Sequence, residues 1–310
     1  MSTPPNAMPP QSTLNAQPPT PRAIPPTQVF LWSVRRELWE YRSIYIAPLV
    51  VAALIIFGFL ISTVHLPSKM RAAMALGPMQ LQEFIEKPYD FAALLLMGTT
   101  FLVAIFYSLD ALYGERRDRS ILFWKSLPVS DVIAVLSKAS IPIIVLPLLT
   151  FIITFATQWI MLLINSAVLL ASGMSVAPLW SHLTLVHTFF MIFYHVLAIH
   201  GLWYAPIYAW LLMVSAWARR APFLWAALPP LVVGMFEKIA FNSSHFAGML
   251  GSRVGGPEEP TSTAGKMSMD ALTHPAPSHF LLSPHLWLGL ALAAIFLAAA
   301  IRLRRYREPI

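Results

Sequence analysis

The chain has 310 residues, of which 57% are hydrophobic and only 11% are charged. Soluble domains carry about a quarter charged residues, so this composition predicts an integral membrane protein. The net charge of +7 would suit a nucleic-acid partner, but the basic residues lie beside apolar segments, as topology signals do, and we expect no nucleic-acid binding. The absence of cysteine excludes disulfides, thiolate catalysis and Cys-ligated metals.

Two segments precede the first apolar stretch. Residues 1–26 contain nine prolines together with Ser, Thr, Gln and Asn, which predicts a disordered cytoplasmic tail. Residues 27–42 are expected to form an amphipathic helix lying in the membrane interface, with its arginines toward lipid phosphates. The alternative is a cytosolic extension of the first span. One face of this helix carries Val29, Trp32, Arg36 and Trp39.

The apolar pattern predicts an all-α membrane protein with six transmembrane helices in a domain of residues 43–305, because each apolar stretch can cross a hydrocarbon core of about 30 Å. Three longer loops connect the spans. They are a polar loop of residues 65–89, a cytosolic loop of residues 113–138 and an outer loop of residues 242–280. The expected spans are residues 45–64, 91–112, 139–170, 183–216, 222–241 and 283–303.

The distribution of Lys and Arg predicts the orientation. Fifteen of them fall on the side that holds the N-terminus, the loops after the second and fourth spans, and the C-terminus. The opposite side has five, and Lys238 lies at a span end. Because positive charge accumulates on the cytoplasmic side, both termini are expected in the cytoplasm.

Neither ATP hydrolysis nor metal chemistry is expected from this chain. Its only near match to a phosphate-binding loop, residues 264–267, lacks the required Gly and the Ser or Thr that binds magnesium. Histidines in the fourth span would suit a haem or a metal, but no carboxylate lies at mid-membrane depth, so we favour packing among aromatic rings. These histidines are His182, His187, His195 and His200.

A polar stripe runs along one face of the third span, since its members recur at helical spacing. Such a face turns away from lipid because unpaired polar groups are costly in hydrocarbon. Helix–helix hydrogen bonding is one interpretation, and a lined pathway or dimer face is the other. The stripe consists of Thr150, Thr154, Thr157, Gln158 and Asn165.

The loop of residues 113–138 changes character along its length. A charged segment ends at Arg119, and residues 120–127 form a bulky apolar run that is too short to span a membrane. Pro128 ends this run, and Ser130 or Asp131 is expected to cap the next helix. An exposed apolar patch of this kind marks a partner site; a helix half-sunk in the lipid headgroups is the alternative.

The order of residues in this loop resembles that between the second and third spans of ABC-2-type transporter permeases. It runs Glu115-Arg116, Ser120-Ile121-Leu122, Ser126-Leu127-Pro128-Val129-Ser130 and then Lys138. The resemblance covers residues 28–305, although only the loop is specific. Two features depart from the family pattern. Ser120 stands where Gly-Thr or Gly-Ser is common, and the proline-rich tail is not a family requirement.

The resemblance implies the membrane subunit of an ABC exporter in a bacterial inner membrane. It would pair with a second permease copy or paralogue and with two copies of a separate ATPase, which would bind the ATP and magnesium. Residues 115–131 would include a coupling helix, and a peptide, lipid or drug-like molecule would be exported. The implied coupling residues are Glu115, Arg116, Arg119, Ile121, Leu122, Phe123, Trp124, Leu127 and Pro128. Among these, Phe123, Trp124 and Leu127 would be apolar anchors, Glu115, Arg116 and Arg119 polar contacts, and Pro128 the bend.

Two other functions remain open at this point. The chain could be a non-transporting assembly subunit that passes ATP-driven motion to a periplasmic partner through residues 242–280. The histidines leave a membrane-embedded redox or haem protein as a third alternative.

Overall fold

The computed structural model describes residues 25–126, 129–182, 189–190, 192–194, 196–255 and 281–306. This part of the chain is helical with short connections and contains no strand, which confirms the all-α class. Nearly all of the expected N-terminal tail lies outside it, as do Leu127, Pro128 and residues 256–280 of the expected outer loop.

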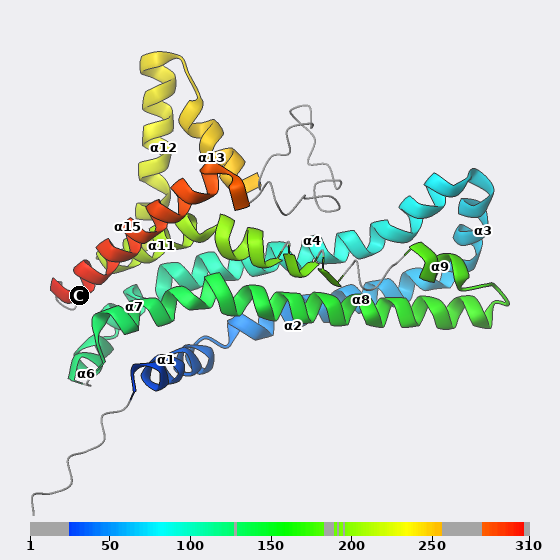
Figure 1. Ribbon diagram of the computed structural model, residues 1–310, viewed down its shortest axis with the longest axis horizontal. Coiled ribbons are helices and arrows are strands. Elements are labelled where there is room, and N and C mark those ends of the chain that lie inside the picture. The colour runs from blue at the N-terminus through cyan, green and yellow to red at the C-terminus, as the bar shows by residue number, and fades with distance from the viewer. Residues whose placement is uncertain are drawn as a thin grey trace, which may run out of the picture.

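The helices follow one another closely along the chain (Figure 1). In order they are α1 Pro26–Glu40, α2 Ser43–Ser62, η2 Thr63–His65, α3 Leu66–Leu76, α4 Pro78–Asp110, α5 Tyr113–Arg117, α6 Ser120–Ser126, α7 Asp131–Ser140, η3 Ile141–Val145, α8 Leu146–Ala171, α9 Ala177–His182, η4 Val196–Trp203, α11 Ala205–Trp217, α12 Pro222–Phe241, α13 His245–Gly255 and α15 Pro284–Tyr306.

Within the described residues, five helical stretches are long and apolar enough to cross a membrane. They are Ser43–Leu76, Pro78–Arg117, Asp131–Ala171, Pro222–Phe241 and Pro284–Tyr306. The pair Ile192–Trp203 and Ala205–Trp217 meets the same criteria when joined, and it bends by 42°. The chain is therefore a helical, multi-pass membrane protein, with a sixth span where this bent pair is counted as one.

The connection between the first two spans differs from the expected polar loop of residues 65–89. It is helical, with α3 continuing beyond α2 and α4 beginning at Pro78. Gly77 reverses the chain between them at φ +122°, a conformation that glycine adopts without strain. At 1.5 Å per residue, α4 is about 50 Å long and exceeds a bilayer core, so it must tilt within the membrane or extend beyond it.

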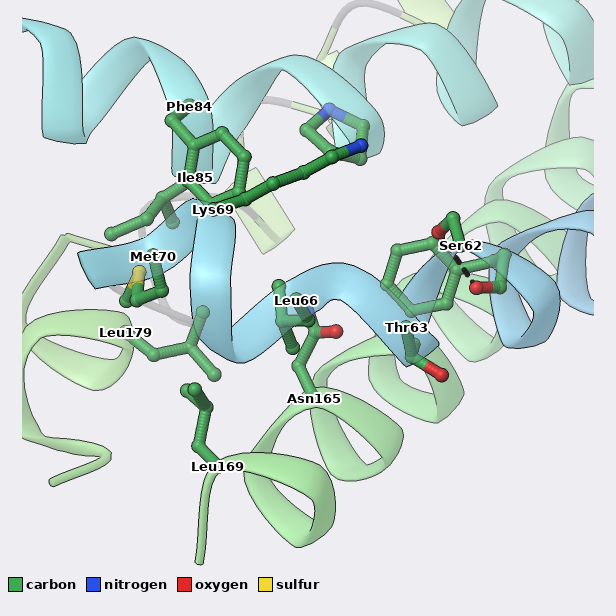
Figure 2. Close-up of a pocket in the computed structure, with 12 residues that line it drawn as sticks. Ser62, Thr63, Leu66, Lys69, Met70, Phe84, Ile85, Asn165, Leu169 and Leu179 are labelled. Atoms are coloured by element: carbon green, nitrogen blue, oxygen red, sulfur yellow. Dashed lines mark hydrogen bonds between the residues drawn. The ribbon is translucent and has the colours of Figure 1, made fainter. Parts of the chain in front are cut away.

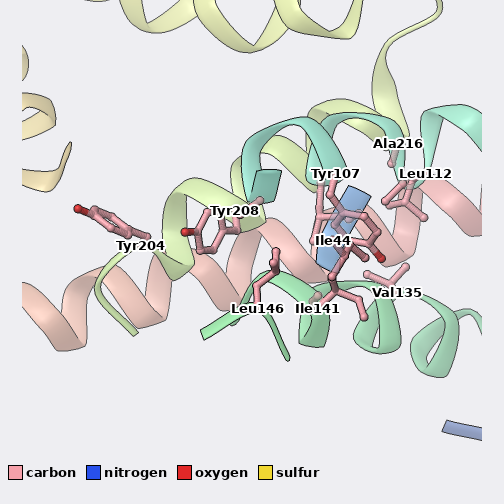
Figure 3. Close-up of a cluster of buried hydrophobic side chains, with 14 of the residues drawn as sticks. Ile44, Tyr107, Leu112, Val135, Ile141, Leu146, Tyr204, Tyr208 and Ala216 are labelled. Carbon is pink, nitrogen blue, oxygen red and sulfur yellow. The ribbon is translucent and has the colours of Figure 1, made fainter. Parts of the chain in front are cut away.

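Three long helices, α2, α4 and α8, pack side by side along the longest axis (Figure 1). The helix α11 packs against α15 and α4, whereas α12 and α13 project away from this group. The largest apolar cluster lies where α2, α4, α7, η3 and α11 meet (Figure 3). Its buried side chains include Ile44, Tyr107, Val135, Ile141 and Tyr208.

Two predictions about helix ends can be checked directly. Ser130 is the N-cap of α7, and its side chain accepts a hydrogen bond from the Ile133 amide at 3.2 Å, so the predicted cap is confirmed. The helix α12 has the bounds expected for the fifth span.

The expected outer loop begins with a fixed helix, α13. The Glu237 carboxylate accepts hydrogen bonds from the Ser243 hydroxyl and from the His245 and Phe246 amides at 2.7–2.8 Å, which holds the turn into α13. At the other end of α13, the Arg253 guanidinium lies 4.2 Å from the centre of the Trp203 ring.

Two π-helical segments, η3 and η4, pack against each other inside the bundle. Pro142 lies in η3 and has no N–H for the α-helical pattern, which favours the local change in hydrogen bonding. Gly201 of η4 permits the close approach, because a Cβ atom there would lie 2.8 Å from the Ile143 carbonyl oxygen.

Replacing Gly201 by Ala should therefore destabilise the protein by about 1–3 kcal/mol, the usual cost of overpacking a well-packed site. The melting temperature followed by tryptophan fluorescence in detergent measures the effect. Gly98→Ala is the matched control, because nothing lies within 4 Å of a Cβ atom at that position. Equal melting temperatures for the two variants would contradict this packing.

Candidate functional site

A cluster of six charged side chains lies at the end of the bundle where α1, α5, α7 and α15 meet. We call it the six-charge cluster; it consists of Arg36, Glu37, Glu115, Asp131, Lys138 and Arg304. Four of its members, Glu37, Glu115, Lys138 and Arg304, are only 1–4% exposed. Buried ions are stable only when paired, and this cluster balances three carboxylates with three cations.

Lys138 lies at the centre of the six-charge cluster. The Lys138 ammonium is 2.9 Å from one Glu37 oxygen and 3.2 Å from one Glu115 oxygen. Arg36 contacts the same two oxygens at 2.7 and 2.9 Å. The Tyr107 hydroxyl of α4 donates to the other Glu37 oxygen at 2.9 Å. Both carboxylates therefore have several donors each, which offsets the cost of removing them from water.

Arg304, near the C-terminal end of α15, closes the cluster. One of its terminal nitrogens lies 3.1 Å from the free Glu115 oxygen, and the other lies 2.8 Å from Asp131. Glu115 is thus held by three cations from three different helices, α1, α7 and α15.

Burial and neighbouring carboxylates shift the pKa values of two groups outside the spans, Arg36 and Tyr41. Burial lowers the pKa of Arg36, but Glu37 and Glu115 raise it more, so its pKa lies above the ordinary value. Burial and then the neighbouring Asp110 carboxylate raise the pKa of the Tyr41 phenol well above its usual range. Tyr41 is therefore protonated and donates to Asp110 at 3.2 Å.

Members of the six-charge cluster flank the short helix α6 on both sides along the chain. Glu115 lies five residues before α6, and Asp131 and Lys138 lie after it, yet all three belong to one ionic network. The Ser120 hydroxyl at the start of α6 also bonds to the Glu115 carbonyl at 3.4 Å. The segments on either side of α6 are therefore held to α1 and α15.

Arg116 adds a link to the fourth apolar segment. Its guanidinium donates to the Ala216 and Ala218 carbonyl oxygens at 2.7 and 3.1 Å, where α11 ends. The Ser215 hydroxyl accepts hydrogen bonds from the Leu112 and Tyr113 backbone amides at the start of α5. Glu115 and Arg116, expected to be outward polar contacts, are therefore buried within this chain, because each has its partners there.

The coupling residues of α6 divide into an inward and an outward set. Ile121 is buried and fixes the helix to the bundle, whereas Leu122 and Phe123 are 58% and 60% exposed. Arg119, just before the helix, is exposed and has a left-handed backbone. The Trp124 side chain, Leu127 and Pro128 lie outside the described residues.

The polar stripe of the third span lies on α8 and faces α4. The Thr150 hydroxyl is 2.6 Å from that of Thr100, and the Gln158 amide donates to the Tyr89 carbonyl at 3.3 Å. The remaining members, Thr154, Thr157 and Asn165, are buried as well. Thr150, Gln158 and Asn165 contact α4, whereas the Thr157 hydroxyl bonds to the Ile153 carbonyl within α8 and the Thr154 hydroxyl has no hydrogen-bond partner among the described residues. Part of the stripe is therefore a helix–helix contact within one chain.

Of the four histidines in the fourth apolar segment, only His200 has a side chain that the structure describes. His200 is buried, and its Nε2 lies 3.1 Å from the Met97 carbonyl oxygen. His187, His195 and the side chain of His182 lie outside the described residues. Within the described part of the chain, no group of three or more His, Asp and Glu residues could hold a metal ion.

Sequence reasoning missed the central roles of Glu37 and Arg304. Arg36, expected to face lipid phosphates, instead turns toward Glu115. A signal was present for Glu37, because it shares a helical face with Val34, Leu38 and Tyr41, which pack into the core. An acidic residue on the apolar face of a helix requires a buried cation as its partner.

Removing one member of the six-charge cluster should cost about 3–5 kcal/mol of stability, because it leaves one buried charge of the cluster uncompensated. We expect Glu37→Gln and Lys138→Met each to lower the melting temperature strongly in detergent. The double variant, which restores the balance of charge, should recover most of the loss. Glu40→Gln is the control for an exposed charge: it removes the 3.3 Å ion pair between Arg36 and the half-exposed Glu40 at the edge of the cluster, and it should cost no more than about 1 kcal/mol. Additive losses in the double variant would argue against this coupling.

No protein-family model matches the chain, and no curated protein or solved structure is significantly similar to it.

Proposed function

We propose that this chain is the permease subunit of an ATP-driven ABC-2-type transporter, and that a separate ATPase subunit drives it through α6. The observation that carries the proposal is that the chain segments on either side of α6 carry members of the six-charge cluster, Glu115 before the helix and Asp131 and Lys138 after it. A partner that moves α6 therefore moves the helices that share these charges.

The outward face of α6 supports the docking step. Leu122 and Phe123 are exposed on a short helix that is too short to cross a membrane. Exposed apolar side chains of this kind favour a protein partner. The sequence has no phosphate-binding motif of its own, so ATP and magnesium belong to that partner in this proposal.

The energetics of the cluster support the transmission step. Separating a buried ion from its partners costs several kcal/mol, whereas a small movement of packed helices as a unit breaks none of these contacts. Displacement of α6 by an ATPase is therefore passed to α1 and α15 rather than absorbed by local rearrangement.

The remaining features of the proposal follow from the membrane topology. Six spans are possible if the bent pair is counted as one, and the excess of Lys and Arg on one side supports a topology with both termini in the cytoplasm; the membrane in this proposal is a bacterial inner membrane. Two permease copies, or this chain and a paralogue, would then enclose a pathway for export of a peptide, lipid or drug-like substrate.

The docking step is tested by Leu122→Asp and Phe123→Asp. Each variant should reduce co-purification of the ATPase subunit by on the order of tenfold or more, because a charge replaces a buried apolar contact in the complex. Co-purification from the native host, with quantification by mass spectrometry, is the measurement.

Ser126→Asp is the matched control, since it adds the same charge at an exposed position of α6 without removing an apolar side chain. It should retain the ATPase. Melting temperatures equal to that of the unsubstituted protein show that the spans remain folded. Undiminished ATPase recovery with both apolar sites substituted would refute docking at α6.

A further inference from the structure

A pocket lies at the end of the bundle opposite the six-charge cluster, where α2, α3, α4, α8 and α9 come together (Figure 2). Its wall is mostly apolar and includes Phe59, Leu66, Phe84 and Leu179. The helical connection through α3 forms one side of it, so the pocket depends on the part of the chain that the sequence predicts to be a polar loop.

The cavity volume of about 230 Å³ limits what can enter. An apolar cavity of about 150 Å³ accepts benzene, whereas sites for drug-sized ligands start at about 300 Å³. The space therefore suits a segment of an alkyl chain and is too small for a whole drug-like molecule. An exported peptide would not fit for the same reason.

Two buried polar side chains line this pocket. The Thr63 hydroxyl is satisfied by the Leu60 carbonyl oxygen at 2.7 Å, whereas Asn165 is not fully hydrogen-bonded. Asn165 is 5% exposed and lines the pocket, and its Nδ2 donates to the Tyr89 hydroxyl at 3.1 Å. Its Oδ1 has no hydrogen-bond partner among the described residues. If the amide were turned over, its nitrogen would be left unpaired instead. A ligand that supplies a hydrogen bond here would remove a cost of about 1–3 kcal/mol.

A cation lies at the edge of the same pocket. Lys69 of α3 is exposed, and no described residue forms an ion pair with it. Figure 2 shows its side chain extending past Phe84. Lys69 follows the end of the expected first span, residues 45–64, by five residues, and long cationic side chains near span ends reach the membrane interface, where lipid phosphates lie.

We propose that this pocket binds a single-chain anionic amphiphile that carries a hydroxyl group near its head. The alkyl chain lies between Leu66 and Leu179, the anionic group pairs with Lys69, and the hydroxyl bonds to Asn165. A hydroxylated fatty acid and a lysophospholipid with a free glycerol hydroxyl share this chemistry. The site is independent of any ATPase docking at α6.

Photolabelling of the full-length protein tests the proposal. The probes are a 3-hydroxy fatty acid with a diazirine in its chain, the same fatty acid without the hydroxyl, and lysophosphatidylglycerol with the same labelled chain. Peptide mass spectrometry should locate the label in residues 59–70, 84–88 and 165–179. Comparing the two hydroxylated probes shows which ligand the pocket prefers: the one that labels it more strongly, the free acid or the lysophospholipid, is the better match.

Substitutions distinguish labelling in this pocket from labelling by general contact with lipid. Leu66→Trp fills the pocket and should reduce this labelling by on the order of tenfold, whereas Leu76→Trp, at an exposed position of the same helix, should not. Lys69→Gln should weaken labelling by about fivefold, and Lys87→Gln, also exposed, should leave it unchanged.

Asn165→Leu should abolish the preference for the hydroxylated fatty acid over its deoxy analogue while the protein keeps its fold, as checked by its melting temperature. Labelling spread evenly over all apolar helices, or equal labelling of the Leu66→Trp and Leu76→Trp variants, would overturn the proposal. A hydroxyl preference that persists in Asn165→Leu would remove Asn165 from the site.

Discussion

The balanced pairing of buried charges constrains this protein more than any other interaction. Glu37, Glu115 and Lys138 are removed from solvent, and each is stable there only because the others are in place. The contacts come from helices far apart in sequence, so the first helix, the loop between two spans and the last helix must be positioned together. That requirement positions the chain segments on either side of α6.

The two halves of the bundle are held together by different forces. At one end, ion pairs make separation of α1, α7 and α15 expensive. Along α4 and α8, the contacts are neutral hydrogen bonds, such as that between Thr100 and Thr150, each worth about 0.5–1.5 kcal/mol. Small rearrangements along α4 and α8 are therefore less costly than opening the ionic end.

Local patterns predicted much of the architecture. Hydropathy gave the helical class and most apolar segments, proline and serine placed the start of α7 correctly, and α12 has the expected bounds. The polar stripe on α8 was recognisable by its spacing. Its partner was not, because the spacing shows that one face avoids lipid without showing whether α4, a second chain or a water-filled pathway covers that face.

The sequence by itself determined a helical membrane protein with charged residues concentrated near span ends, since lipid excludes unpaired charge and polar backbone. Only the tertiary structure decided what those charges do. Arg36 and Arg304 are equally compatible with lipid phosphates when read along the chain, yet both reach Glu115 across 79 and 189 residues. The choice depends on three-dimensional proximity, because a buried carboxylate attracts whichever cations the packing of the helices brings within hydrogen-bonding distance.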